Sequence, residues 1–234
     1  MKTIISIFML LLASMSLQAQ VRHIKPSTVL ALRDFPFDKY DQLQKIMADR
    51  KLTAAEEKTL EQFEDNVIFE ELYSGHCSWY CGGQVDTITA SSALKPSKSY
   101  TYEASNAHDF DHETAWVEGA QGHGIGEWLC YEFSGSCPRI TTVKIMNGYI
   151  KSDKTWRDNG RVKSLLLYYN GEPYAILDLV DSRSLQCFDV GTLGFHDSGA
   201  PSWTLKFEIK EVYPGKKYAD TAITELYFDG IDVH

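Results

Sequence analysis

Residues 104–116, with the sequence ASNAHDFDHETAW, gather oxygen-bearing side chains whose spacing suits a hard cation. Asp109 and Asp111 stand two apart, and Thr114 follows them. Calcium takes six to eight oxygen ligands from carboxylates, carbonyls and hydroxyls, and a loop of this composition can supply them. The same residues also form Asx turns, in which short polar side chains accept hydrogen bonds from their own backbone. The sequence leaves both interpretations open.

Other constellations give weaker indications of chemistry. His108 and His112 flank the aspartates, but no tetrahedral set accompanies them, which disfavours zinc. The glycine-rich run 122–126 is followed by a strand pattern rather than a helix, so it does not match a dinucleotide loop. Glu118 and Glu127 carry no mark of a catalytic acid pair. We therefore expect the chain not to be an enzyme.

Residues 147–161, NGYIKSDKTWRDNGR, place two Lys, two Arg and two aromatic side chains between two predicted strands. An aromatic platform with planar, forked donors suits a sugar, and Lys151 and Lys154 favour an acidic one. The alternative is a solvated loop whose Trp156 packs on the core. We expect this segment and residues 117–126 to form a ligand face, with contacts from Glu118, Asn147, Tyr149, Lys151, Trp156, Arg157, Asn159 and Arg161.

The beginning of the chain has the pattern of a signal peptide. Lys2 precedes an apolar run that is shorter than the about 20 residues needed to span a bilayer, and Ala19 suits a cleavage position. We expect residues 1–19 to be removed and the protein to be secreted or periplasmic. Loss of Lys2 leaves 22 basic against 32 acidic residues, a net charge of 22 − 32 = −10. This charge disfavours nucleic acid and anionic membrane as partners of the whole surface.

Five cysteines remain in an exported chain, where oxidising conditions permit disulfides. Close spacing suggests the pairs Cys77–Cys81 and Cys130–Cys137, and the odd count leaves Cys187 outside this scheme. A zinc site that includes Cys77 is the rival interpretation, but no matching second pair of cysteines accompanies it.

Two kinds of periodicity divide the remaining chain. Residues 21–33 show no clear period and are expected to form an arm. From about 37 to 73 apolar residues recur at helical spacing, with a break at 49–52 and a capping box from Thr53 to Glu56, which predicts a helical hairpin. This hairpin is expected to pack on the domain that follows it.

After Gly75 the pattern changes to short alternating segments rich in β-branched and aromatic residues. Asn170-Gly171 is a strong signal for a two-residue hairpin turn. A mainly β fold follows, a sandwich or jelly roll. The expected strands are 85–90, 127–133, 140–146, 162–169, 174–179, 185–190, 205–209 and 223–228.

Four blocks of sequence resemble a known family when taken in order. They are DHETAWVEG at 111–119, GIGEW at 124–128, VKIMNGY at 143–149 and YPGKKYADTAITE at 213–225. Together they resemble the discoidin-type (coagulation factor C-domain, galactose-binding-like) jelly roll, and more narrowly the translocation domain of bacterial NAD glycohydrolase toxins. The resemblance covers roughly residues 77–230. It does not cover residues 21–75. Together with the signal-peptide pattern and the periodicity, it divides the chain into 1–19 (signal peptide), 20–75 (arm and helical segment) and 76–234 (discoidin-like β-sandwich).

The resemblance implies a non-catalytic module that binds carbohydrate on a cell surface or polysaccharide. It does not imply NAD hydrolysis, which belongs to a separate catalytic domain, and no organic cofactor is expected. It also implies a structural calcium ion held by Asp109, by the backbone carbonyls of Asn106 and Asp111, and by Thr114 and Glu225. Phe110 stands where many relatives have Gly. The alternative function is that of an interaction protein that docks another exported protein.

Overall fold

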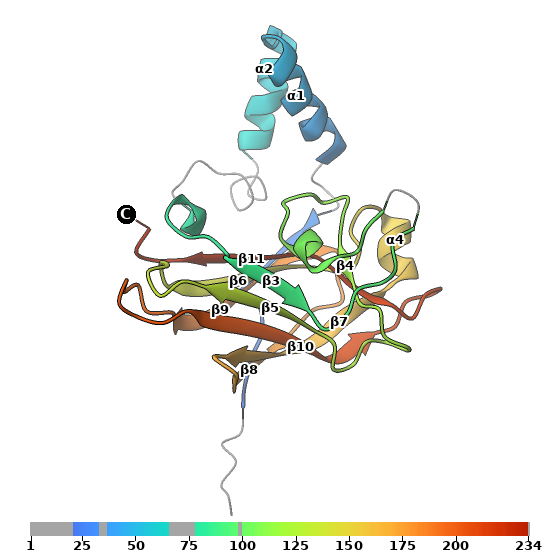
Figure 1. Cartoon of the computed structure of the whole chain (residues 1–234). Coiled ribbons are helices and arrows are strands. Elements are labelled where there is room, and N and C mark those ends of the chain that lie inside the picture. The colour runs from blue at the N-terminus through green and yellow to red at the C-terminus, as the bar shows by residue number, and fades with distance from the viewer. Residues whose placement is uncertain (1–20, 33–36, 66–77, 98–99, 234) are drawn as a thin grey trace, which may run out of the picture.

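The computed structural model describes residues 21–32, 37–65, 78–97 and 100–233. A β-sandwich forms most of the molecule, and a helical hairpin stands above it (Figure 1). The mainly β fold predicted from alternating segments is confirmed. None of the described helices has the length and apolar character that a membrane span requires.

One layer of the sandwich has the strand order β2-β9-β6-β11, and β4 extends it by pairing with β11. The bounds are Thr28–Ala31 for β2, Ser184–Leu193 for β9, Ile140–Asn147 for β6, Thr221–Gly230 for β11 and Trp116–Val117 for β4.

The other layer has the order β1-β8-β7-β10-β5-β3. Its bounds are Arg22–Ile24 for β1, Glu172–Asp178 for β8, Gly160–Tyr169 for β7, Trp203–Tyr213 for β10, Trp128–Phe133 for β5 and Thr87–Ala90 for β3. A short parallel pairing of β11 with β7, Thr221 to Gly160 and Ala222 to Arg161, joins the two layers at one end.

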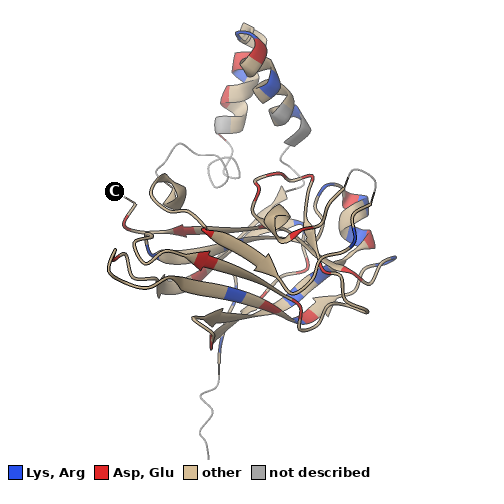
Figure 2. Cartoon of the chain, in the orientation of Figure 1, with Lys and Arg blue, Asp and Glu red and all other residues tan. Residues whose placement is uncertain are grey.

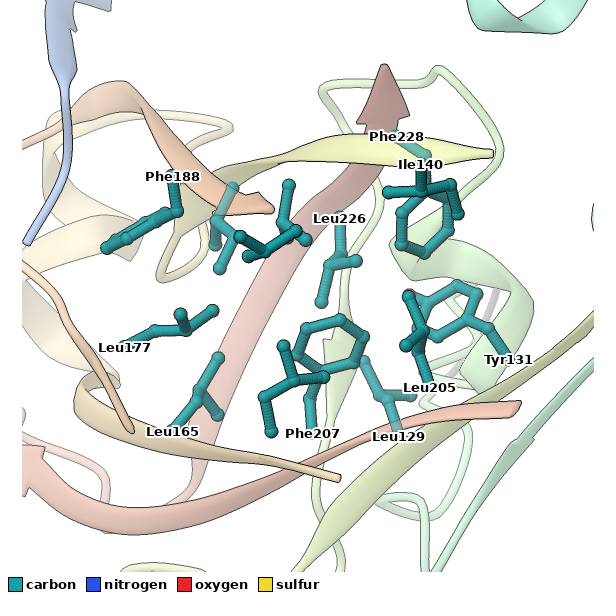
Figure 3. Close-up of a cluster of buried hydrophobic side chains, with 14 of the residues drawn as sticks. Leu129, Tyr131, Ile140, Leu165, Leu177, Phe188, Leu205, Phe207, Leu226 and Phe228 are labelled. Atoms are coloured by element: carbon teal, nitrogen blue, oxygen red, sulfur yellow. The ribbon is translucent and has the colours of Figure 1, made fainter. Parts of the chain in front are cut away.

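The core lies between the two layers, as Figure 3 shows. Alternating residues of each strand point inward, which is why the period-2 pattern located the strands. The turn at Asn170-Gly171 has φ of 50° and 82°, as the predicted hairpin turn requires. Facing side chains in the close-up are Ile140, Phe188, Leu226 and Phe228 from one layer and Leu129, Tyr131, Leu165, Leu177, Leu205 and Phe207 from the other.

The helical hairpin consists of α1 (Phe37–Asp49) and α2 (Ala54–Glu64), and the predicted capping box at Thr53 and Glu56 is present. Tyr40 of α1 meets Phe63 of α2 edge to face, with ring centroids 5.6 Å apart. A second buried cluster joins these hairpin residues to Met146, Leu185, Cys187 and Tyr227 of the sheet. The expected helix stop at Gly75 lies outside the described residues.

Residues 21–33, which show no clear period in the sequence, contain two short strands in the structure. β1 pairs in parallel with β8, and β2 pairs antiparallel with β9. The arm thus covers an edge of each layer, where unpaired backbone groups would otherwise be exposed. Backbone pairing of three or four residues needs no side-chain alternation, so the sequence pattern did not reveal it.

Candidate functional site

One end of the sandwich carries the loops that the sequence singled out. Residues 118–127 precede β5, residues 148–159 join β6 to β7 and include the short helix α4 (Asp153–Asp158), and residues 214–220 join β10 to β11. The strand registers place all of these loops at the end opposite to the last residues of β11. We call the loops 118–127, 148–159 and 214–220 the loop end.

Hydrogen bonds connect the third loop to the other two, through the backbone on one side and through a histidine side chain on the other. The Lys216 amide donates to the Arg157 carbonyl at 2.9 Å, and the Tyr218 amide donates to the Asp158 carbonyl at 2.8 Å. On the other side, His123 Nδ1 lies 3.2 Å from the Ala219 carbonyl oxygen. The structure therefore brings the two predicted segments together through a loop that was not predicted to contribute.

Glu118 is fully buried and holds the loop end in shape. Its carboxylate accepts hydrogen bonds from the Thr221 amide at 3.0 Å and the Ala120 amide at 2.8 Å. Burial raises the pKa of Glu118 above its ordinary value. Gly124 has φ of 69°, and a Cβ there would come within 2.5 Å of the Glu118 side chain. Glu118 is thus a structural anchor, and not the exposed sugar contact that was expected.

Asn147, Trp156 and Arg161 are also bonded within the protein. Asn147 is buried and pairs through its side-chain amide with both the amide and the carbonyl of Val162, at 2.9 and 2.7 Å. Trp156 Nε1 donates to the Asn147 carbonyl, and the Arg161 guanidinium covers its ring at 4.7 Å from the centroid. The expected Trp156 platform is therefore occupied, and the packing alternative fits the structure.

Arg161 has its hydrogen-bonding capacity taken up by three acceptors. Its Nε and Nη2 atoms donate to the two Asp181 carboxylate oxygens at 3.0 and 2.9 Å. Its Nη1 atom donates to the carbonyls of Asn159 and Pro214, each at 3.1 Å. This buried guanidinium joins β7 to the loop 214–220, so it stabilises the loop end without being available to a ligand.

The other predicted contacts differ in exposure. The Tyr149 hydroxyl donates to the Glu113 carbonyl at 2.9 Å, and the Asn159 amide donates to the Thr155 carbonyl at 2.8 Å. Lys151 lies 3.4 Å from the Glu113 carboxylate and 4.9 Å from the exposed ring of Tyr100. Arg157 is exposed, and its side chain projects from the last turn of α4.

Sequence analysis missed Lys216, Lys217 and Tyr218, although the block that contains them was used to identify the family. All three are exposed, and the Lys217 ammonium lies 4.8 Å from the Tyr218 ring centroid. Figure 2 shows basic residues at α4 and at the tip of the neighbouring loop. The sequence feature that could have indicated these ligand contacts was the Lys-Lys-Tyr run between two predicted strands of an acidic chain.

The Asp-rich loop lies elsewhere, beside β11. It follows the short helix η3 (Ala104–Ala107), and its Asx-turn bonds are formed: Asp109 Oδ1 accepts from the Asp111 amide at 2.9 Å. The Thr114 hydroxyl donates to Asp109 Oδ2 at 2.8 Å. The Asn106 side chain donates to the Thr101 carbonyl at 2.9 Å, which fixes the start of the loop.

Glu225 of β11 is a buried carboxylate next to this loop. The residue is fully buried, and neither carboxylate oxygen has a hydrogen-bond partner in the described part of the chain. Burial raises the pKa of Glu225 well above its ordinary value, the Asp109 charge adds to the rise, and the neighbouring Tyr227 side chain offsets part of it. A buried carboxylate without a donor is costly unless a cation compensates it. The donor set is rich in oxygen and therefore fits calcium.

No group of three or more His, Cys, Asp or Glu side chains in the described ranges is arranged to hold a metal. The calcium ligands implied by the family resemblance would not form such a group. Only Asp109 and Glu225 among them would contribute carboxylates, and the other ligands would be a hydroxyl and backbone carbonyls. His108 Nδ1 contacts the Leu226 carbonyl oxygen at 2.7 Å, inside an aromatic cluster. The His108 side chain is thus bonded and packed within the protein.

Phe110 adopts φ of 62°, the left-handed conformation that Gly adopts freely. Its ring stacks on Tyr227, with centroids 4.7 Å apart and planes inclined by 17°, and meets Tyr80 edge to face. The aromatic contacts therefore hold a non-glycine residue in the backbone shape that this position requires.

The predicted Cys130–Cys137 disulfide is wrong, because both residues carry free thiols in the structure. Cys130 lies on the face of β5 opposite to Leu129 and Tyr131, whereas Cys137 is buried in the core. Cys137 Sγ instead donates to the Gln84 carbonyl at 3.5 Å. Close spacing in sequence did not account for the alternation of a strand. The Cys77–Cys81 pair involves a residue outside the described ranges.

The two layers, the loop end and the Asp-rich loop together define a discoidin-type β-sandwich. The chain belongs to the NAD glycohydrolase translocation F5/8 type C domain family, whose model matches residues 79–229. This finding confirms the resemblance drawn from the sequence blocks. No curated protein matches the chain.

Several solved structures are similar to the chain at low identity. The CBM32-1 and CBM32-2 domains of Clostridium perfringens ZmpB in complex with GalNAc share 13% identity, with a TM-score of 0.48, covering 71% of this chain and 37% of that one. A CBM32 domain from the same organism, in complex with GalNAc-β-1,3-galactose, shares 15% identity over 62% of this chain and 94% of that one, with a TM-score of 0.45. This chain covers 34% of the ZmpB CBM32 pair in a further structure.

Proposed function

We propose that the chain is an exported, non-catalytic carbohydrate-binding module that holds a glycan at the loop end. The observation that carries this proposal is the fixed arrangement of the three loops, which expose Arg157, Lys216, Lys217 and Tyr218 next to one another. A surface that is ordered before binding loses little entropy when a ligand arrives. Membership of the F5/8 type C domain family supports the proposal only in that it gives the chain a discoidin-type fold.

The exposed side chains have the chemistry that a sugar needs. Tyr218 is 44% exposed and offers an aromatic face to the apolar side of a pyranose. Arg157 offers planar, forked donors to hydroxyl or anionic groups. Ile125 of the loop 118–127 is 57% exposed and adds apolar surface at the same end. Binding sites on rigid sandwiches commonly use such loops.

The carboxylates of the loop end support a non-catalytic role. Glu118 accepts two backbone amides and is fully buried. Glu127 accepts hydrogen bonds from the hydroxyls of Ser91 and Ser92. Both side chains therefore orient the loops, which is the role of a scaffold for binding rather than of an acid–base pair.

The Asp-rich loop is proposed to hold a structural calcium ion. Asp109 and Glu225 would give carboxylates, Thr114 its hydroxyl, and Asn106 and Asp111 their backbone carbonyls. The partnerless Glu225 carboxylate supports this assignment, because a cation would compensate its buried charge. The ion would tie the loop to β11.

Export is proposed from residues 1–19, whose pattern is that of a signal peptide. An exported module would meet glycans of a cell surface or of a polysaccharide, the partner class that the loop end suits. Another exported protein remains the alternative partner.

A glycan array that includes GalNAc, probed with the purified chain with and without calcium, tests the function. We expect binding that Tyr218→Ala reduces at least about 10-fold, the size expected for loss of an aromatic contact at a binding hot spot. Phe195→Ala is the matched control, because Phe195 is 40% exposed in the loop before β10, at the opposite end of the strands. Absence of binding to every glycan, or equal losses in the two variants, would contradict the proposal.

A further inference from the structure

We propose that the loop end selects anionic glycans, carrying carboxylate or sulfate groups, over neutral ones. This inference rests on the proposed carbohydrate binding and adds the charge class of the ligand. It depends on four cationic side chains from two segments, Lys154 and Arg157 of α4 and Lys216 and Lys217 of the following loop.

The four cations are held close together by the backbone. The Lys216 and Lys217 amides donate to the carbonyls of Arg157 and Asp158 at 2.9 and 3.1 Å. The loop 214–220 therefore cannot move away from α4 without breaking these bonds. Because folding already brings the positive groups together, their mutual repulsion lowers the stability of the fold and does not add to the free-energy cost of binding a ligand.

Three of the four cations are available to a ligand. Lys154 pairs with Asp158, four residues along α4. Arg157, Lys216 and Lys217 form no ion pair within the portion of the chain that the structure describes, and all three are exposed. Asp153, the other acid of α4, lies 3.7 Å from Arg183 instead. Asp220 is the one acid of the loop 214–220. Four basic against three acidic residues give α4 and this loop a net charge of 4 − 3 = +1.

This excess contrasts with the rest of the molecule, because the whole chain has a net charge of −9. The net negative charge of the chain repels an anionic ligand overall, so a local basic patch would direct that ligand to the loop end. Arg157 can pair with a carboxylate or sulfate through two parallel hydrogen bonds, while the lysines act as point charges. The Lys217 ammonium lies over one face of the Tyr218 ring, at 4.8 Å from its centroid, so the other face of this 44% exposed residue would serve as the sugar platform.

The test measures binding of the purified chain to immobilised heparin, to polygalacturonate, to neutral galactan and to phosphatidylserine vesicles. Each is measured in low and in high sodium chloride, because salt screens charge–charge attraction at an exposed surface. The patch variant is Lys216→Ser with Lys217→Ser. The control is Lys45→Ser with Lys58→Ser, which removes the same charge from exposed positions on the hairpin.

We expect binding to one or both anionic polymers, weakened by salt and lowered at least about 10-fold in the patch variant. The control should bind as the wild type does. Binding to neutral galactan alone, unaffected by salt, would overturn the anionic preference and leave the proposed function intact. Equal losses in the patch and control variants would overturn the placement at the loop end. Binding to the vesicles alone, or to no probe, would overturn the anionic preference, and the glycan array then decides the proposed function separately.

Discussion

The Asp-rich loop and the segment 147–161 differ in what their buried polar groups are bonded to. In the segment, Asn147 pairs with the backbone of Val162, and Arg161 is held by Asp181 and two carbonyls. Beside the loop, Glu225 is equally buried, but no described residue forms a hydrogen bond with either carboxylate oxygen. Both regions are polar and rich in aromatic residues, so composition did not distinguish them.

This contrast gives a physical criterion for distinguishing structural residues from ligand-binding residues, namely whether a buried polar group has its hydrogen-bond partners within the protein. A buried polar group with all its partners contributes to stability and has nothing left to offer a ligand. A buried carboxylate without a partner destabilises the fold until something binds it. By this criterion Asn147 and Arg161 belong to the scaffold, whereas Lys154 and Arg157 of the same segment stay exposed. The Asp-rich loop becomes the candidate for cation binding.

The largest expected effect comes from Arg161→Ala compared with Arg157→Ala. Removing Arg161 leaves Asp181 and two carbonyls without their donor, which should lower the free energy of unfolding by about 3 kcal/mol. Arg157 is exposed and forms no ion pair in the described structure, so its loss should change stability by less than about 0.5 kcal/mol. Urea unfolding measures both. Equal effects of the two variants would remove the distinction between scaffold and ligand contact.

The sequence predicts those features of the fold that depend on residues close to one another along the chain. Strands such as β5 and β10 follow from alternation along the chain, and the turn at Asn170-Gly171 follows from its residue types. The pairing of β1 with β8 joins residues about 150 positions apart and leaves no local pattern. The Cys130–Cys137 prediction failed for a related reason, since spacing alone does not tell which face of a strand a side chain occupies.

The candidate site shows the same limit. The sequence located the Asp-rich loop and included Glu225 through the family resemblance. Only the structure shows that Glu225 is buried and that its carboxylate lacks a hydrogen bond from the residues described. It placed a ligand face at 117–126 and 147–161, yet exposure decides which side chains can reach a ligand. Lys216, Lys217 and Tyr218 became candidates only when the third loop was seen bonded to α4.

A smaller effect is expected at Phe110, where strain and stacking oppose each other. Phe110→Ala removes the ring contact with Tyr227 and keeps a residue that disfavours φ of 62°. Phe110→Gly removes the same contact but relieves the strain, so it should be about 1 kcal/mol more stable than the Ala variant. Thermal unfolding of the two variants gives the comparison. A Gly variant that is less stable than the Ala variant would show that the loop does not require this conformation.

Titration of the purified chain with calcium, followed by calorimetry and by thermal unfolding, tests the central distinction most directly. We predict one calcium ion per chain and a stabilisation of about 2.7 kcal/mol when free calcium is 100 times its dissociation constant. Glu225→Gln should abolish both signals and leave the calcium-free protein at least as stable as wild type, because an uncharged amide replaces a buried carboxylate. Absence of binding heat and of any shift in the wild-type midpoint would contradict the account and make the loop a set of Asx turns.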